Sequence, residues 1–270
     1  MAYAFVIDVA KCSGCYNCQL ACKDEHAGND WTPYAKAQPE IGQFWLKVDE
    51  HVQGSIPKVK IHYIPRLCGH CRKAACIDAC PEQAILRRED GLVLIDPQRC
   101  SGCGKCRDAC PYGVIYMNAE LNIAQKCTGC AHLLDHGAKQ PRCVEACPTE
   151  AIRFGPEESL TDYIEGAQVL LPEEGLKPRV YYRSIPGKFI GGTVYDPAEK
   201  EVIIGARCLL SSGGKNWEAF TDSYGDFWFR DLPVGLYDLV IHAEGYEYRS
   251  FAGIKTSEAV NLGDIPLKRV

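Results

Sequence analysis

The chain has 270 residues, 46% of them hydrophobic, and a formal net charge of −5. This length allows two domains with separate cores, and the acidic balance offers no basic surface for nucleic acid or an anionic membrane. The apolar runs are far too short to span a bilayer, so no direct membrane insertion is expected. The first ten residues lack the pattern of a signal peptide, which predicts a cytoplasmic protein unless a signal-bearing partner exports it.

The N-terminal half alternates predicted strands with loops rich in cysteine. A strand is predicted over residues 3–9, and an insert over residues 27–67 predicts two further strands, 44–52 and 58–64, around a glycine-containing turn. The insert carries four aromatic residues, which predict either its own core or a docking surface for a partner. They are Trp31, Tyr34, Phe44 and Trp45.

The C-terminal half changes in character. Residues 156–188 are rich in proline and acidic residues, which predicts a linker with a short helix near residues 160–169. Residues 189–270 then repeat strand-like runs separated by turns, which is typical of an all-β domain. The clearest strands are 206–210, 227–229 and 236–241. In the last of these, alternation predicts three core-facing residues: Tyr237, Leu239 and Ile241.

Sixteen of the seventeen cysteines form four groups of four. They are Cys12, Cys15, Cys18 and Cys22; Cys68, Cys71, Cys76 and Cys80; Cys100, Cys103, Cys106 and Cys110; and Cys127, Cys130, Cys143 and Cys147. The first and third groups share the spacing C-x2-C-x2-C-x3-C, whereas the second and fourth have wider middle gaps. Three groups end in a similar phrase, in which Cys-Pro is followed by two variable residues, then Ala or Val, then Ile. Such a repeat indicates copied supersecondary units. Cys208 stands apart in a predicted strand, where we expect a buried free thiol.

Three chemistries use cysteines at such density. Disulfides do not suit a C-x2-C-x2-C run around one centre, and the cysteine count is odd. A structural zinc site is an alternative for the fourth group alone, because zinc prefers two cysteine pairs separated by a longer stretch. The first and third groups have the run of bacterial ferredoxins, in which the last cysteine ligates the other cluster of a pair. Sixteen cysteines therefore predict four [4Fe–4S] clusters in two pairs.

The spacing of the groups and the approach to the second one resemble a known family. With Gly54-Ser-Ile-Pro57 and Pro65-Arg-Leu-Cys68, residues 3–155 resemble the four-cluster ferredoxin-type subunits of the dimethyl sulfoxide reductase superfamily of molybdopterin oxidoreductases. The resemblance implies a duplicated bacterial-ferredoxin-like domain over residues 1–155, in which the first group pairs with the fourth and the second with the third. The four implied sites, numbered one to four, are Cys12, Cys15, Cys18 and Cys147; Cys22, Cys127, Cys130 and Cys143; Cys68, Cys71, Cys76 and Cys110; and Cys80, Cys100, Cys103 and Cys106.

The C-terminal part adds a second resemblance. Thr221-Asp-Ser-Tyr-Gly225 and Leu232-Pro-Val-Gly235 are similar to the transthyretin-like or carboxypeptidase-regulatory β-sandwich. Such a sandwich behind a ferredoxin-type domain is similar to the small subunits of pyrogallol–phloroglucinol transhydroxylases and related aromatic hydroxylases and dehydroxylases. The expected fold class is therefore α+β, with the sandwich over residues 189–270.

These resemblances imply an iron–sulfur electron-transfer subunit of a molybdenum or tungsten pterin oxidoreductase in anaerobic metabolism. The chain itself is expected to contain no catalytic residue. The molybdopterin cofactor is expected only in a large catalytic partner that acts on a hydroxylated aromatic substrate, and an external donor or acceptor exchanges electrons with the clusters. A stand-alone polyferredoxin shuttle is the alternative, although the aromatic insert and the sandwich exceed what a small diffusing carrier needs.

Charged and imidazole side chains near the cysteines complete the set of candidates. Lys11 and Lys126 each precede a cysteine directly, where a positive charge either tunes a cluster potential or is simply solvated. Four histidines lie near cysteines, but histidine ligation is not expected because sixteen cysteines already complete four sets. They are His26, His70, His132 and His136.

Overall fold

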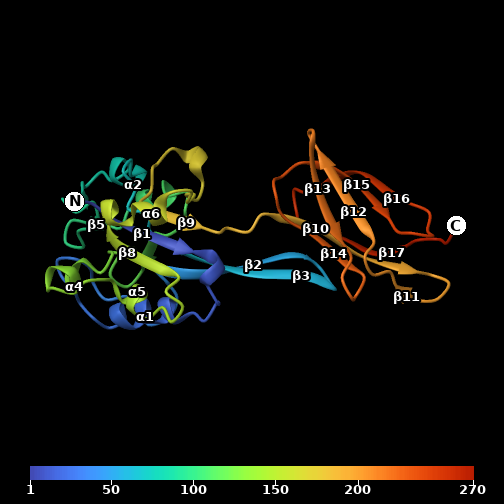
Figure 1. Cartoon of the computed structure of the whole chain (residues 1–270). Coiled ribbons are helices and arrows are strands. Elements are labelled where there is room, and N and C mark those ends of the chain that lie inside the picture. Colours follow the sequence, from blue (N-terminus) through green and yellow to red (C-terminus); the bar gives the residue numbers. More distant parts are fainter. The chain divides into compact units, whose positions relative to one another are not determined.

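The structure is a computed structural model that describes residues 1–270. The chain divides into two compact units (Figure 1). Unit 1 comprises Met1–Glu50 and His62–Ile185, and unit 2 comprises His51–Ile61 and Pro186–Val270. Each unit has its own hydrophobic core, as the chain length predicts. None of the helices has the length and apolar character needed to cross a bilayer.

A three-stranded sheet forms the centre of unit 1. In order across the sheet, its strands are β8 (Ile152–Pro156), β1 (Tyr3–Asp8) and β9 (Val180–Arg183). Strand β1 runs antiparallel to β8 and parallel to β9. It is apolar on both faces, because Phe5 and Ile7 enter the core that contains the cysteines while Ala4 and Val6 pack against Leu160. The predicted strand over residues 3–9 is confirmed.

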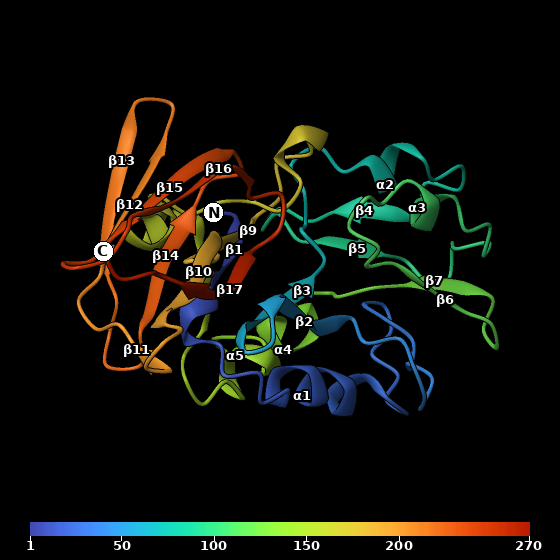
Figure 2. The same ribbon diagram turned by 90° about the vertical axis from the view of Figure 1, so that its right-hand side faces the viewer.

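The helices of unit 1 are short, and most of them carry or flank cysteines. They are η1 (Val9–Lys11), α1 (Asn17–His26), α2 (Ala75–Asp78), α3 (Lys105–Asp108), α4 (Ala131–Asp135), α5 (Arg142–Glu145), η2 (Glu157–Leu160), α6 (Thr161–Ile164) and η3 (Pro172–Glu174). Two hairpins lie among them: β4 (Ile85–Arg87) with β5 (Val93–Ile95), and β6 (Tyr116–Asn118) with β7 (Ile123–Gln125). Figure 2 shows both hairpins together with α2 and α3.

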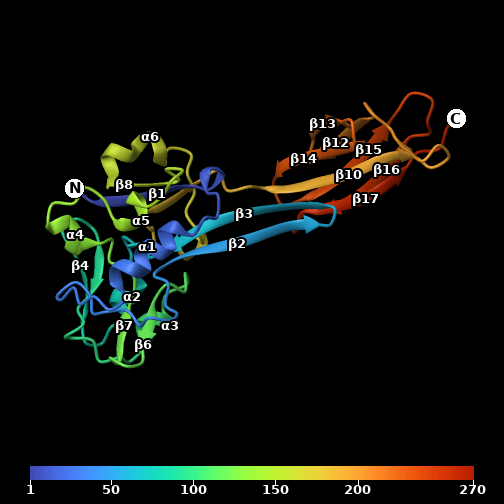
Figure 3. The ribbon, with the colours of Figure 1, turned by 90° about the horizontal axis from the view of Figure 1, so that it is seen from below.

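The helices that carry cysteines pack in two pairs. Helix α1 packs on α5, as Figure 3 shows, and α2 packs on α3. The first pair brings the first cysteine group to the fourth, and the second pair brings the second group to the third. The repeat in the sequence therefore has a counterpart in the packing.

Residues 156–185 differ from the expected linker, since they fold within unit 1. Strand β9 completes the central sheet beside β1, and η2 and α6 lie between β8 and β9. The backbone of the intervening loop also bonds to the second cysteine group's approach: Arg179 N donates to Gly69 O at 2.7 Å, and Arg72 N donates to Lys177 O at 2.9 Å. Pro172–Glu174 form the exposed turn η3, whereas Pro178 is buried, so composition alone did not reveal which parts of the segment pack. The expected helix over 160–169 is limited to α6.

The insert forms a long hairpin of β2 (Leu46–Ser55) and β3 (Lys58–Leu67). Strand β2 begins two residues after the predicted start at 44 and ends three residues beyond 52, and β3 ends three residues beyond the predicted 64. The turn falls at residues 56–57 and not at the predicted glycine, because Gly54 lies within β2. The tip, residues 51–61, belongs to unit 2. Among the aromatic residues of the insert, Trp45 is buried with its ring against His26, whereas Trp31, Tyr34 and Phe44 are partly exposed. Trp45 therefore belongs to the core of unit 1.

Unit 2 contains two sheets around one apolar core. In the first sheet β10 (Lys188–Asp196) pairs with β11 (Glu201–Val202), β14 (Asp226–Leu232) and β17 (Val260–Pro266). The second has the order β13 (Lys215–Phe220), β12 (Arg207–Ser212), β15 (Leu236–His242) and β16 (Arg249–Lys255). Tyr237, Leu239 and Ile241 are buried, as predicted. Cys208 is a fully buried free thiol, and burial raises its pKa to about 12.

Candidate metal centres

The first two cysteines of each group flank a turn that needs an unusual backbone conformation. The residue directly before the second cysteine has a positive φ in all four groups: Gly14 at 68°, His70 at 41°, Gly102 at 73° and Gly129 at 66°. Glycine adopts this region without strain, which explains its use in three of the four groups. A side chain at Gly102 would also collide with the backbone oxygen of Asn122. The tight turn is therefore built into the sequence.

Backbone amides donate hydrogen bonds to several cysteine sulfurs. The pairs are His70 N to Cys68 Sγ (3.5 Å), Gly129 N to Cys127 Sγ (3.3 Å), Ala124 N to Cys100 Sγ (3.4 Å), Ala84 N to Cys80 Sγ (3.3 Å) and Ala151 N to Cys147 Sγ (3.2 Å). Such bonds stabilise negative charge on sulfur. The last two use the same position of the repeated Cys-Pro phrase, four residues after the cysteine. Two copies of the repeat therefore share a sulfur-facing amide as well as a cysteine.

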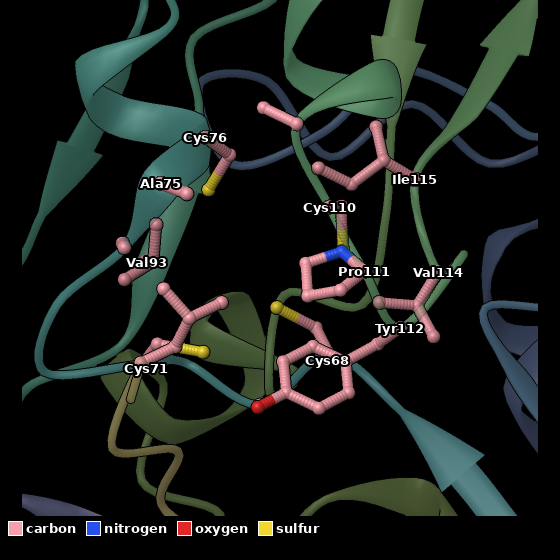
Figure 4. A pocket seen from close by; sticks show the side chains of 14 residues that line it. Cys68, Cys71, Ala75, Cys76, Val93, Cys110, Pro111, Tyr112, Val114 and Ile115 are labelled. Atoms are coloured by element: carbon pink, nitrogen blue, oxygen red, sulfur yellow. The ribbon is translucent and has the colours of Figure 1, made fainter. Parts of the chain in front are cut away.

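Four sulfurs of site three face one cavity. Cys68, Cys71, Cys76 and Cys110 line it, and Figure 4 shows their sulfur atoms directed toward its interior. Its other walls are largely apolar and include Val93 and Leu176. Cys110 comes from the third group, while the other three cysteines come from the second. Cys80, the last cysteine of the second group, does not line this cavity.

A second cavity is lined by the four cysteines of site four. Cys80 joins Cys100, Cys103 and Cys106 there, together with apolar residues such as Ile85 and Ala124. The last cysteines of the second and third groups are thus exchanged between the two cavities.

The cysteines of sites one and two are grouped by their electrostatic interactions. Burial raises the pKa of Cys18 to about 12, and Cys12, Cys147 and Cys15 contribute to the increase. Burial also raises the pKa of Cys143, and the next contributions come from Cys130, Cys22 and Cys127, followed by Cys18 of site one. Each set again contains one cysteine from the other group of its pair.

The donor sets have the chemistry of polynuclear sulfur ligation. In site three, burial followed by repulsion from Cys68 raises the pKa of Cys71 to about 12, so the cavity disfavours thiolates unless positive charge enters it. Metal binding deprotonates cysteine and supplies that charge. No three His, Cys, Asp or Glu side chains are arranged for a single metal ion. The four sulfurs around each cavity suit a larger iron–sulfur core, which would supply one-electron redox chemistry when bound.

Two polar residues adjoin site three: Tyr112, which did not stand out in the sequence, and His70, which did. Tyr112 lines the site-three cavity, and its buried hydroxyl has no hydrogen-bond partner in the chain. Its signal was the aromatic residue in the phrase Cys110-Pro-Tyr, where the other copies have Glu or Thr. His70 is buried, and its Nδ1 accepts a hydrogen bond from Val93 N at 3.0 Å. Because Nδ1 accepts this hydrogen bond, its lone pair is not available to ligate a metal.

The two candidate lysines lie in opposite environments. Lys11 is exposed at the end of η1. Lys126 is buried, and its ammonium donates to the carbonyl oxygens of Val93 and Cys127. Sequence alone did not distinguish them, because both precede a cysteine.

The other histidines near cysteines pack among aromatic and acidic residues. His132 stacks on Trp31 with ring centroids 4.4 Å apart, and its Nε2 lies 3.1 Å from Oε1 of Glu25. Burial lowers the pKa of His26 to about 3, so this ring is neutral at physiological pH. His136 Nδ1 lies 2.6 Å from His132 O. His26 and His132 are therefore packed side chains of unit 1, whereas His136 is exposed.

Comparison with known proteins gives a family for each part of the chain. Residues 59–157 match a 4Fe–4S dicluster domain, and residues 190–268 match a carboxypeptidase regulatory-like domain. The chain is 39% identical to the pyrogallol hydroxytransferase small subunit of Pelobacter acidigallici, over 98% of this chain and 99% of that protein.

Other relatives share mainly the cysteine-rich part. The chain is 35% identical to a tetrathionate reductase subunit of Salmonella typhimurium, over 70% of this chain and 74% of that protein. It is 33% identical to the arsenate respiratory reductase iron–sulfur subunit of a Shewanella species, over 67% of this chain and 96% of that protein.

The chain therefore belongs to the iron–sulfur subunits of the molybdopterin oxidoreductases. It is a non-catalytic electron-transfer subunit that binds [4Fe–4S] clusters and serves a large catalytic subunit. The family and the role that the sequence predicted are confirmed, as is a cluster-binding domain followed by a regulatory-like β domain.

Proposed function

We propose that this chain relays electrons through four [4Fe–4S] clusters between a molybdenum or tungsten pterin site in its catalytic partner and an external donor or acceptor. We propose further that the complex transforms a hydroxylated aromatic substrate. The observation that carries the cluster assignment is the grouping of sixteen cysteines into four sets of four, two of which line separate cavities.

The proposed ligands cross within each pair of groups. Site one takes Cys12, Cys15, Cys18 and Cys147; site two takes Cys22, Cys127, Cys130 and Cys143; site three takes Cys68, Cys71, Cys76 and Cys110; and site four takes Cys80, Cys100, Cys103 and Cys106. The exchange of Cys80 and Cys110 between the two cavities supports this pattern. It is the arrangement of two-cluster ferredoxins. The pairing of α1 with α5 and of α2 with α3 supports a duplicated ferredoxin-like domain in unit 1.

The aromatic substrate class is supported by how far each relative extends along the chain. The small subunit of pyrogallol hydroxytransferase matches 98% of this chain, so it includes the counterpart of unit 2. The tetrathionate and arsenate relatives match 70% and 67%. The complex of this chain is therefore proposed to act on a polyphenol of the pyrogallol type, in a hydroxylation, dehydroxylation or transhydroxylation.

Ligand substitution tests the crossed arrangement. In the complex purified with its catalytic subunit, four clusters of four irons correspond to about sixteen iron atoms per chain. Cys110→Ser should remove the same EPR signal as Cys76→Ser, and Cys80→Ser the same signal as Cys106→Ser. Cys208→Ser is the control, and it should retain all of the iron because Cys208 lies in the core of unit 2. Loss of one common signal in Cys110→Ser and Cys106→Ser would contradict the crossed sets.

The substrate class is tested on the same complex. Oxidised complex is mixed with pyrogallol under anaerobic conditions, and products are followed by liquid chromatography while the clusters are followed by EPR. Conversion of pyrogallol supports the proposal. In a parallel assay the complex is first reduced with reduced methyl viologen. Reduction of tetrathionate or arsenate there, with pyrogallol unchanged in both assays, would assign the complex to another substrate class.

We propose a cytoplasmic location for the complex. Sixteen cysteines are assigned to clusters, and the remaining one, Cys208, is a buried free thiol, which suits a reducing compartment. Fractionation with antibody detection tests this, and recovery in the periplasmic fraction would instead indicate export with a signal-bearing partner.

A further inference from the structure

Lys126 lies where sites two and three approach each other. Its side chain is only 2% exposed. In sequence it directly precedes Cys127 of site two, but its ammonium reaches β5 and donates to the carbonyl oxygen of Val93, which lines site three. A second hydrogen bond goes to the carbonyl oxygen of Cys127 at 3.2 Å. The side chain is thus anchored to the backbone of both sites.

The position of Lys126 brings its charge close to both sites. Val93, whose carbonyl oxygen accepts from the ammonium, lines the same cavity as Cys68 and Cys76 of site three. Cys127 of site two is the next residue in the chain, and its carbonyl oxygen accepts the second hydrogen bond. Sites two and three belong to different ferredoxin-like pairs, so Lys126 lies at the junction that an electron crosses between the pairs.

We propose that Lys126 is a positioning residue for electron transfer, whose buried charge raises the reduction potentials of the clusters at sites two and three together. This inference rests on the proposed four-cluster function. Reduction adds one electron to a cluster and makes no bond, so a nearby positive charge stabilises the reduced form. Because Lys126 is shielded from solvent, its effect is weakly screened by salt. Because both reduction potentials rise together, the difference between them changes little. Electron transfer between the clusters at sites two and three therefore keeps a small driving force in either direction.

Three substitutions separate the charge of Lys126 from its packing. Lys126→Met removes both charge and hydrogen bonds, Lys126→Gln retains a donor for the Val93 carbonyl, and Lys126→Arg retains the charge. Lys11→Met is the matched control, since Lys11 also precedes a cysteine but is exposed. Each variant is purified as the complex with the catalytic subunit, its iron is counted, and the four clusters are titrated by EPR at defined potentials.

The expected result is selective. In Lys126→Met and Lys126→Gln, the reduced-to-oxidised ratio of two clusters at a fixed potential should fall about tenfold, which is about 59 mV for a one-electron couple. The clusters at sites one and four should shift much less, and Lys126→Arg should resemble the parent. If both uncharged variants lose iron, loss confined to two clusters and restored in Lys126→Arg also supports the proposal.

Several outcomes would overturn it. These are unchanged potentials in variants with full iron, an equal shift of all four clusters, iron loss from all four sites, or an equally large effect of Lys11→Met at sites two and three. A failure of the underlying four-cluster function appears separately, because the parent complex itself would then hold fewer than four clusters.

Discussion

The ammonium of Lys58 lies 2.6 Å from Oδ1 of Asp226 in unit 2, and the lysine side chain is only 3% exposed. Lys58 belongs to the tip of the β2–β3 hairpin, and Asp226 begins β14. The ammonium also lies 5.2 Å from the centroid of the Trp228 ring. Nearby, Asn261 Nδ2 donates to Ser55 O at 3.1 Å. The hairpin tip is therefore fixed to the sheet of unit 2 by a buried ion pair and by side-chain contacts.

Lys58→Met should destabilise unit 2 because it leaves the carboxylate of Asp226 partly buried without its cation. Removal of one partner of a buried pair costs several kcal/mol, and the partial exposure of Asp226 reduces this to about 2–3 kcal/mol. Hydrogen exchange of the β14 amides measures the change, and it should accelerate by at least about tenfold. Lys60→Met is the control, because Lys60 is exposed and its ammonium also lies over the Trp228 ring, 5.1 Å from the centroid, but forms no ion pair with Asp226. Equal acceleration in both variants would argue against the ion pair.

The same pair predicts a pH dependence for unit 2. Burial raises the pKa of Asp226, but hydrogen bonds from Lys58 and Thr193 outweigh burial and hold the pKa below its usual value. A carboxylate with a lowered folded pKa stabilises the fold fully above its unfolded pKa of about 3.9, and this contribution is lost as the pH falls through the folded pKa.

Asp226→Asn should therefore be less stable than the parent at pH 6, and the difference should shrink below about pH 4. Hydrogen exchange of the β14 amides is measured by mass spectrometry at increasing urea concentrations. It gives the free energy of unfolding of the parent and of Asp226→Asn at each pH. A difference that stays constant between pH 6 and pH 3 would exclude Asp226 as its source.

Local patterns in the sequence were sufficient to predict features that depend on contacts between residues close together in the chain. The spacing from Cys100 to Cys110 implied a tight cluster-binding loop, and alternation in 236–241 identified its buried face, because neither depends on distant residues. The assignment of Cys110 to site three needed a family resemblance, since spacing alone does not say which run is its partner.

Contacts between distant segments could not be foreseen. The tip of the insert belongs to unit 2 through Lys58 and Asp226, which are 168 positions apart in the sequence (226 − 58). Residues 156–185 resemble a linker in composition, yet their backbone completes a sheet with β1. Burial of Lys126 depends on where the Val93 carbonyl lies. Each of these features is set by tertiary packing, and no periodicity in the sequence reports it.

Gly102→Ala should disturb site four through the backbone. Gly102 has a φ of 73°, which costs an alanine about 1 kcal/mol, and the added methyl group would meet the backbone oxygen of Asn122, which cannot rotate away. We expect partial or complete loss of the site-four cluster, measured as iron content and as one missing EPR signal. Gly137→Ala is the control, because Gly137 also has a positive φ but nothing lies within 4 Å of the added atom. Full iron in Gly102→Ala would show that the loop adapts.

Tyr112→Phe should lower the potential of the site-three cluster alone. The hydroxyl of Tyr112 is buried, and it has no partner in the chain. Tyr112 lines the site-three cavity together with Cys68 and Cys71 (Figure 4). A hydrogen bond from this hydroxyl to sulfur stabilises the more negative, reduced state. A bond worth about 1 kcal/mol corresponds to a shift of roughly 40 mV for one electron.

The control for this substitution is Tyr182→Phe. The Tyr182 hydroxyl is also buried in unit 1, but it donates to Pro65 O at 3.0 Å and lines neither cysteine cavity. Its loss should reduce stability by about 1 kcal/mol and leave all four potentials unchanged. EPR-monitored redox titration of both variants compares the two effects directly. If Tyr112→Phe leaves the site-three potential unchanged, its hydroxyl does not bond to the cluster, and if both variants shift it equally, the cause is general loosening of unit 1.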